Sequence, residues 1–166
     1  IADLEIDTFN NENALLDGHE FVEKVSLQNL VKTINSKTDV SFEIPIKPYE
    51  VSPQSNLNAF FGKGRKSKNG LVKPRHWYEV ELIVPNRITC QAGYPRSKTD
   101  SAVFRVITDD GWSFKCKVSG TDSKNFRSDS DLRILGKWLK GRLENAGVLT
   151  VGNPVTADTL KRYGRS

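Results

Sequence analysis

The chain has 166 residues, 37% of them hydrophobic and 27% charged, which is typical of a folded soluble domain and argues against disorder along its whole length. No apolar stretch approaches the roughly 20 residues that a transmembrane helix needs, which argues against a membrane protein. The chain begins with Ile1 and contains no methionine, and we therefore expect it to be a piece of a longer protein.

The charge is unevenly distributed along the chain. Residues 1–53 carry 4 Lys/Arg and 10 Asp/Glu, residues 54–117 carry 12 and 5, and residues 118–166 carry 9 and 5. An acidic first third followed by a basic remainder is typical of a protein with one face for a polyanion, of which nucleic acid is the commonest. The competing interpretation is an ordinary solvated basic surface.

The first 39 residues are predicted to be a linker with a helical lead-in. Residues 1–17 are acidic, rich in asparagine and without clear periodicity. A short helix, capped by Ser26, is then predicted from apolar residues at helical spacing: Leu27, Leu30, Val31 and Ile34.

From residue 40 onward the hydrophobic period changes to two, which predicts β-strands. The predicted strands cover residues 40–46, 77–84, 103–108 and 112–118. Asp109-Asp110-Gly111 joins the last two strands and is a strong hairpin signal. Helical spacing returns over residues 132–143, with Gly147 as a stop signal, and over residues 156–164. The pattern predicts a mainly β protein, all-β or α+β, with an antiparallel core and a few helices at its ends.

The two cysteines, Cys90 and Cys116, do not form a CxxC motif, so the sequence gives no support for a thiolate metal site. Cys116 alternates with Phe114 and Val118 on a predicted strand, and we expect it to be a core residue. So low a cysteine content is typical of a reducing compartment.

The strongest candidate for a binding site is the basic loop 63–75, which lies between two predicted strands. It contains six cationic side chains and no acid, and His76 and Trp77 follow directly. Clustered Lys and Arg neutralise phosphates, and Arg can also bind guanine through two hydrogen bonds. The competing interpretation is a solvated loop, but six like charges repel one another unless a polyanion neutralises them.

Two further polar segments flank this region. Upstream, Ser55, Asn56 and Asn58 are short polar side chains, and asparagine can pair with adenine. Downstream, the loop 119–127 extends a strand whose predicted outward face shows Ser113, Lys115 and Lys117. Small polar side chains in such a loop could reach base edges, although the loop could also be a plain connection.

Catalytic motifs are sparse. The two histidines, His19 and His76, do not begin the H-x-K motif of a phospholipase-D-type nuclease. Asp110, Asp122 and Lys124 have a spacing similar to that of metal-dependent nucleases, in which two carboxylates hold Mg²⁺ and a lysine assists the attacking water. Because Asp110-Gly111 is better explained as a hairpin turn, this site is kept only as an alternative.

Four segments, taken in order, resemble one family. They are Ser55-x-Leu57-Asn58 followed by the basic loop and EVELIVP (79–85), FRVITDDGWSFKCK (104–117), LGKWL (135–139) and LKRYGR (160–165). Together they resemble the B3-like DNA-recognition domain found at the C-terminus of certain type II restriction endonucleases, over about residues 40–166.

The resemblance implies a seven-stranded open β-barrel, or DNA-binding pseudobarrel, with short flanking helices. It also implies two arms that grip the major groove, here about residues 55–78 and 117–127. The partners would be double-stranded DNA with a short asymmetric site and an N-terminal nuclease domain of the parent chain. The fragment itself would then not be an enzyme, would need no cofactor or metal, and would work in the bacterial cytoplasm.

The residues and the resemblance together predict the DNA contacts. Base edges are assigned to Asn56, Asn58, Arg65 and Arg75 on one arm and to Ser119, Asp122, Lys124 and Asn125 on the other. Phosphates are assigned to Lys63, Lys66, Lys68, Lys73, Lys115, Arg127, Lys161, Arg162 and Arg165. The rest of the predicted interface is Ser55, His76, Trp77, Lys117, Thr121 and Ser123.

Several alternatives stay open at this point. Trp77 and Trp112 could pack in the arms or be buried in the barrel. Besides the metal-dependent nuclease, the chain could be an RNA or single-strand binder, which would need exposed aromatic side chains. It could also be a protein-interaction module whose acidic first third meets a basic partner.

Overall fold

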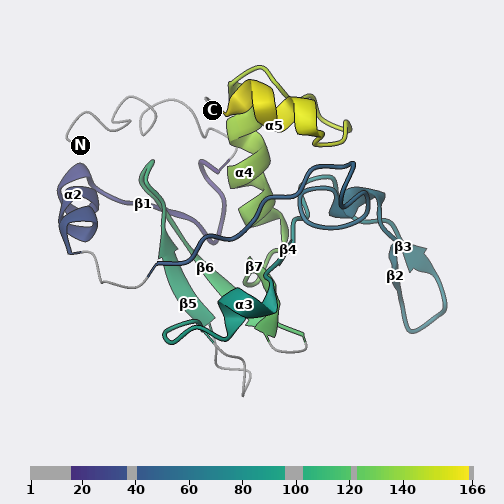
Figure 1. The fold of residues 1–166 in the computed structure, drawn as a ribbon, viewed down its shortest axis with the longest axis horizontal. Coiled ribbons are helices and arrows are strands. Elements are labelled where there is room, and N and C mark those ends of the chain that lie inside the picture. Colours follow the sequence, from purple (N-terminus) through teal and green to yellow (C-terminus); the bar gives the residue numbers. More distant parts are fainter. Residues whose placement is uncertain (1–15, 37–40, 96–102, 121–122, 165–166) are drawn as a thin grey trace.

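The computed structural model describes residues 16–36, 41–95, 103–120 and 123–164 (Figure 1). The helices are α2 (Leu27–Asn35), a 3-10 turn η1 (Ala59–Phe61), α3 (Asn86–Thr89), α4 (Arg133–Asn145) and α5 (Ala157–Tyr163). The strands are β1 (Glu23–Lys24), β2 (Arg65–Lys66), β3 (Val72–Lys73), β4 (Leu82–Ile83), β5 (Val103–Ile107), β6 (Trp112–Ser119) and β7 (Asn125–Ser128).

The main sheet is antiparallel and is organised around β6. Strand β5 pairs with one edge of β6, from Val103 opposite Lys117 to Ile107 opposite Ser113. The other edge of β6 is shared by β1 and β7, and β4 continues the sheet beyond β7. A separate two-stranded sheet is formed by β2 and β3. The predicted mainly β, antiparallel class is therefore confirmed.

The two faces of β6 differ in burial, as the alternation of its residues predicts. Trp112, Phe114, Cys116 and Val118 are buried, whereas Lys115 is exposed and Lys117 and Ser119 are half-buried. Ser113, predicted to face outward, is buried, and its hydroxyl accepts a hydrogen bond from Arg105 (2.8 Å). The buried face packs against α4, whose Ile134, Leu135 and Leu143 share the core with Phe114. The sheet therefore has one apolar face covered by a helix and one polar face with basic side chains.

The predicted turns and caps agree with the structure. The β5–β6 hairpin closes at residues 108–111, and Ser26 caps α2 by accepting a hydrogen bond from the Asn29 N–H. Helix α4 ends just before Gly147, which has a φ of 75°. Helix α5 begins after a capping box formed by Thr156 and Thr159.

Two predicted strands are largely absent from the ladders. Residues 41–46 are in no strand, and Val40 lies outside the described residues. Only Leu82–Ile83 of the predicted strand 77–84 pairs in the sheet. Their alternating apolar residues still face the core, because Phe42, Ile44, Trp77 and Val80 pack in the hydrophobic clusters. In these two segments the alternating apolar residues indicate that one side of the chain is buried, but they do not show that the segment pairs with a neighbouring strand.

The seven-stranded open barrel stays a prediction. In the described part of the chain the main sheet has five strands and does not close, and β5 pairs with β6 alone. The predicted domain boundary at residues 39 and 40 is likewise untested. Within those described ranges, no helix is long and apolar enough to cross a membrane.

Candidate nucleic-acid interface

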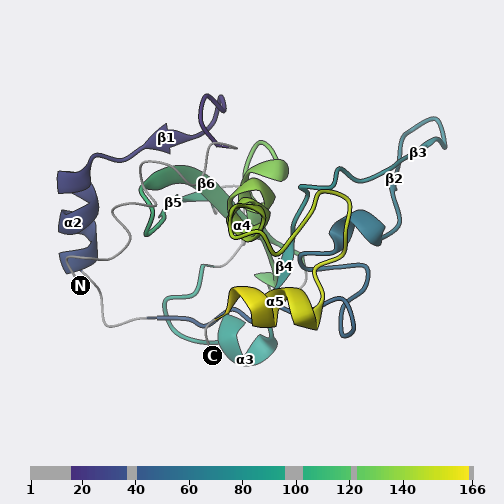
Figure 2. The same cartoon turned by 90° about the horizontal axis from the view of Figure 1, so that it is seen from above.

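The β2–β3 hairpin extends away from the body of the molecule in both views (Figures 1 and 2). Arg65 pairs with Lys73 and Lys66 with Val72. The tip is closed by two backbone hydrogen bonds, from Ser67 N–H to the Leu71 carbonyl (2.7 Å) and from Gly70 N–H to the Ser67 carbonyl (3.0 Å). The basic loop of the sequence is thus an ordered two-stranded ribbon.

Gly64 holds the two strands of this hairpin close together at their root. A Cβ atom at this position would lie 2.2 Å from the carbonyl oxygen of Lys73, a distance that no real Cβ contact reaches. The Arg75 Nε also donates to the Lys63 carbonyl across the same root (3.4 Å). Any larger residue at position 64 would therefore push the strands apart.

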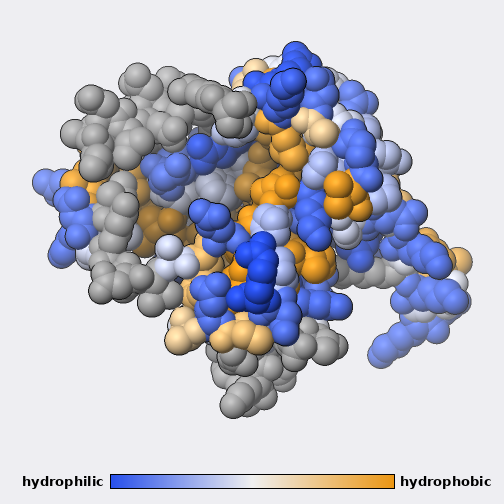
Figure 3. All heavy atoms as spheres, viewed as in Figure 1, coloured by the Kyte–Doolittle hydropathy of each residue, from blue (hydrophilic) through white to orange (hydrophobic). Residues whose placement is uncertain are grey.

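The hairpin carries a strong positive charge that its own chain does not balance. Lys63, Lys66, Lys68 and Lys73 are exposed, and in the described residues none of them takes part in an ion pair. The side chain of Arg65 lies outside what the structure describes. In Figure 3 hydrophilic residues dominate the surface of this projection. The arrangement suits a polyanion, which would neutralise charges that otherwise repel one another.

Two apolar side chains near the hairpin tip were not singled out by the sequence analysis. Leu71 is 70% exposed and Val72 is 57% exposed. Exposed apolar groups on a basic arm can contact thymine methyl groups or the apolar edges of bases. The only signal in the sequence was their position inside a charged loop, which does not distinguish an exposed side chain from a buried one.

Asn56 and Asn58, predicted to contact bases, are buried and need a correction. Both have 0% exposure. The Asn56 amide oxygen accepts from the N–H groups of Lys47 (3.3 Å) and Leu57 (3.0 Å). The Asn58 amide pairs with both backbone groups of Val155, donating at 3.2 Å and accepting at 2.7 Å. These amides join distant segments of the chain and have no free edge for a base; the neighbouring Ser55 is half-buried.

At the root of the hairpin, Trp77 is also inside the protein. It is 5% exposed and belongs to the core cluster, and Trp112 is buried in the same cluster. The burial interpretation therefore holds for both tryptophans. His76 is exposed, but its Nδ1 accepts a hydrogen bond from the Tyr78 N–H (3.2 Å), and its ring stacks on Tyr78. Arg75 is half-buried.

The second predicted arm is the β6–β7 connection, in which Thr121 and Asp122 lie outside the described residues. Its backbone is attached to the body at two points. The Tyr94 hydroxyl donates to the Ser123 carbonyl (3.2 Å), and the Val84 N–H donates to the Lys124 carbonyl (2.7 Å). Ser123 is buried, whereas the side chain of Lys124 is exposed. The loop therefore presents Lys124 from a fixed backbone.

Strands β6 and β7 bring further polar groups next to this loop. Ser119 lies opposite Asn125, and Lys117 opposite Arg127 and 3.5 Å from Asp129. The Asn125 Oδ1 and Arg127 Nε atoms are buried and make no hydrogen bond within the described residues. An unsatisfied buried polar group costs about 1–3 kcal/mol, so a ligand that pairs with these atoms would recover that energy.

The basic residues of the C-terminal helix lie apart from this loop. Lys161 and Arg162 are exposed on α5, and Arg165 lies outside the described residues. In Figure 1 helix α5 is at the top, and the β6–β7 loop is at the bottom of the sheet. The structure thus gathers Lys117, Ser119, Lys124, Asn125 and Arg127 but does not bring the α5 cations to them.

The alternative metal-dependent nuclease site does not assemble. Asp110 is buried, and its carboxylate accepts from the Thr108 hydroxyl (2.5 Å) and the Trp138 indole (3.0 Å). Strand β6, about 26 Å long at 3.3 Å per residue, lies between Asp110 and the loop of Lys124. Lys124 therefore cannot assist a water molecule on a metal ion held by Asp110, and Asp122 lies outside the described residues. In the part of the chain that the structure describes, no cluster of three or more His, Cys, Asp or Glu is suited to hold one.

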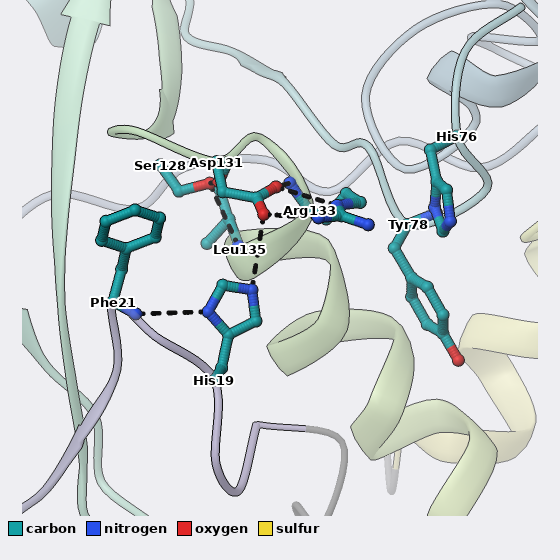
Figure 4. A network of polar contacts seen from close by, with 8 residues as sticks. All are labelled: His19, Phe21, His76, Tyr78, Ser128, Asp131, Arg133 and Leu135. Atoms are coloured by element: carbon teal, nitrogen blue, oxygen red, sulfur yellow. Dashed lines mark hydrogen bonds and ion pairs between the residues drawn. The ribbon is translucent and has the colours of Figure 1, made fainter.

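His19 takes part in a structural network around Asp131 (Figure 4). Its Nδ1 accepts from the Phe21 N–H (3.4 Å), so its Nε2 faces Asp131 (3.4 Å) as the donor. Arg133 donates to both carboxylate oxygens of Asp131, at 3.0 and 2.8 Å. Mainly because of Arg133, the pKa of Asp131 falls to about 2. The network fastens the segment before β1 to the start of α4.

Comparison with known families gives one clear result. A family model described as the NgoFVII C-terminal B3-like DNA-binding domain matches residues 32–166. A search among curated proteins finds no match. The matched range contains both candidate arms and all of β2 to α5. The resemblance inferred from the sequence is thereby confirmed.

Proposed function

Because the chain belongs to the family of NgoFVII C-terminal B3-like DNA-binding domains, we propose that it reads a short sequence of double-stranded DNA through two arms. The family supports DNA binding and recognition for a restriction enzyme, and no catalysis is expected of such a domain. The two-arm mode in the major groove is our proposal. So are the asymmetry of the site, the family's open barrel and a nuclease domain elsewhere in the parent chain.

The observation that carries this proposal is the projecting hairpin. Its four exposed lysines have no ion pair within the described residues, and its two strands form a narrow ribbon. The major groove of B-DNA is about 12 Å wide and admits a two-stranded β-ribbon. In this position the lysines would contact phosphates on the two sides of the groove and set the register of the domain.

The β6–β7 loop supplies the second arm in this proposal. Lys124 is exposed there, and Asn125 and Arg127 have polar atoms that lack partners in the described residues. Base edges offer donors and acceptors in a pattern that differs for each base pair. We assign base contacts to Ser119, Asp122, Lys124, Asn125, Arg65 and Arg75, and we remove Asn56, Asn58 and Trp77 from the set.

Selection from a random duplex library, without metal and at two salt concentrations, tests this function. We expect enrichment of one short motif, together with affinity that falls as salt rises, because the lysines release counterions. Lys124→Ala is expected to relax the preference at particular positions of the motif, and Lys32→Ala on α2 serves as a control with the same loss of charge. If the protein retains DNA from the library but enriches no motif, it does not recognise a specific sequence.

Single-stranded nucleic acid is the second candidate and is tested in the same experiment. Binders of single strands stack bases on exposed aromatic side chains. Among the described residues, the exposed phenylalanine and tyrosine side chains, Phe21, Tyr49 and Tyr163, lie outside both arms. We therefore expect single-stranded DNA of the selected motif to compete poorly with the duplex. If the single-stranded DNA competes as well as the duplex, the protein is a binder of single strands.

A further inference from the structure

One face of α4 contacts the chain segment that directly follows the hairpin. Gly136, Lys140 and Glu144 are spaced four residues apart and so lie in one row along the helix. A Cβ atom at Gly136 would lie 1.6 Å from the Tyr78 carbonyl oxygen, so the helix and this backbone touch directly. The Glu144 Oε1 accepts a hydrogen bond from the Tyr78 hydroxyl (2.9 Å).

Lys140 is the central contact of this row. Its side chain is 1% exposed, and its Nζ donates to the Trp77 carbonyl (2.5 Å) and lies 4.3 Å from the centroid of the Trp77 ring. Burying an ammonium group is costly, because the charge loses its water. An apolar side chain would fill this place in the core without that cost, so the hydrogen bond and the ring contact point to a specific role for the lysine at Trp77.

The connection between these contacts and the hairpin is short and stiff. Three residues, 74–76, separate β3 from Trp77. Pro74 has a φ fixed by its ring, and the His76 side chain accepts from the Tyr78 N–H and stacks on the Tyr78 ring. Few rotatable bonds therefore separate the fixed backbone at Trp77 from the paired strands of the hairpin.

We propose that the row Gly136, Lys140 and Glu144 sets the direction in which the β2–β3 hairpin projects, through Trp77 and Tyr78. Lys140 and Glu144 are positioning residues, since they contact Trp77 and Tyr78, which follow the hairpin, and act on the DNA contacts only through its root. The consequence for DNA recognition rests on the proposed function, whereas the control of hairpin direction does not.

Spin labels measure hairpin direction without DNA. One label is placed on Cys90, which is exposed, and the other on Asn69→Cys at the hairpin tip. Three further changes are compared in this labelled chain: Lys140→Met, Tyr78→Phe, and Lys32→Met as a control on α2 with the same loss of charge. We expect a narrow distance distribution in the parent and the control, and a broader or shifted one in the other two.

Binding of these variants to the selected duplex and to random duplex gives the second readout. We expect the ratio of the two affinities to fall about tenfold, equivalent to 1.4 kcal/mol, in Lys140→Met and Tyr78→Phe. The dependence of the duplex affinities on salt concentration should stay unchanged, because the same lysines remain on the hairpin. A variant that had merely lost stability would instead keep the parent ratio, because a smaller folded fraction lowers both affinities by the same factor.

The spin-label distances test whether α4 orients the hairpin, and the duplex selection tests the proposed DNA recognition separately. Unchanged distance distributions in both variants would overturn the inference, even if the parent chain selects a DNA motif. If Lys140→Met does not fold, Tyr78→Phe decides, since it removes one hydroxyl and keeps the ring. If the parent chain selects no motif, the proposed function fails, and the spin-label distances still decide whether α4 orients the hairpin.

Discussion

The two arms differ in how they are held and in what they offer a ligand. The hairpin projects from the body, is closed at its root by Gly64 and carries lysines without ion pairs in the described residues. The β6–β7 loop is attached to the body through the Ser123 and Lys124 carbonyls and lies beside buried polar atoms of the half-buried Asn125 and Arg127. The difference suggests that the hairpin lysines supply most of the affinity for phosphates, with base contacts added by Arg65 and Arg75, whereas the loop contributes mainly to the choice of sequence.

Opening the hairpin is expected to have the largest effect on DNA binding. Gly64→Val would place side-chain atoms against the Lys73 backbone, and the strands would have to separate. We expect the affinity for random duplex to fall by about 100-fold, since several phosphate contacts are lost. The affinity for the specific duplex should fall further, because the base contacts assigned to Arg65 and Arg75 are lost as well. Titration of both duplexes at one salt concentration measures this, with Asn69→Ala at the tip as the control. A loss confined to the specific duplex would contradict the assigned role of the hairpin.

The second test removes a discriminating group from the loop. Asn125→Ala deletes the amide whose Oδ1 has no partner in the described structure. We expect the specific affinity to fall by about 2 kcal/mol while the random-duplex affinity stays nearly constant, as for the loss of a base contact. Unfolding by urea provides the stability control. Equal losses on both duplexes would assign Asn125 to the phosphates.

A third test concerns the root of the hairpin. Burial lowers the pKa of Lys140 from its ordinary value of 10.5 to about 7, partly opposed by Glu144. Between these values the unfolded chain binds a proton that the folded chain does not, so the free energy of unfolding should rise with pH. Relative to Lys140→Met, the rise should reach about 1.4 kcal/mol per pH unit above pH 7.

Urea unfolding of both chains at pH 6, 7, 8 and 9 checks this expectation. Below pH 7 the difference between the two chains should be constant, because Lys140 is then protonated in both the folded and the unfolded states. A difference that stays flat from pH 7 to 9 would show that Lys140 keeps its proton in the folded protein.

The smallest expected effect comes from a single lysine of the hairpin. Lys68→Ala should weaken binding to every duplex by a similar factor and reduce the slope of log affinity against log salt by about 0.9, the value for one phosphate contact. Binding at four salt concentrations gives the slope, with Lys32→Ala as the matched control. An unchanged slope would place Lys68 away from the phosphates.

The local parts of the fold were predictable from the sequence, because their causes are local. Asp109-Asp110-Gly111 indicates its hairpin, Ser26 and Thr156 cap their helices, and Gly147 marks the end of α4. The basic loop could likewise be singled out from its charge. That it forms a paired ribbon could not, since the decisive contact joins the Gly64 and Lys73 backbones.

The errors arose where distant segments meet. Asn56 and Asn58 have amide side chains that could bind bases, but the Asn58 amide is hydrogen-bonded to the backbone of Val155, 97 residues further along the chain. The sequence did not single out Lys140, because its partner Trp77 lies 63 residues earlier. No local pattern reveals such pairs, because burial of a polar group depends on which segment the fold places beside it.

The most direct test of the division between the arms is a side-by-side selection from a random duplex library by three proteins: the unchanged chain, Lys68→Ala and Asn125→Ala. All three are compared at matched occupancy. We expect Lys68→Ala to select the same motif as the unchanged chain, while Asn125→Ala loses the preference at one or two defined positions. An altered motif for Lys68→Ala together with an unaltered one for Asn125→Ala would show that the two arms do not have the roles proposed for them.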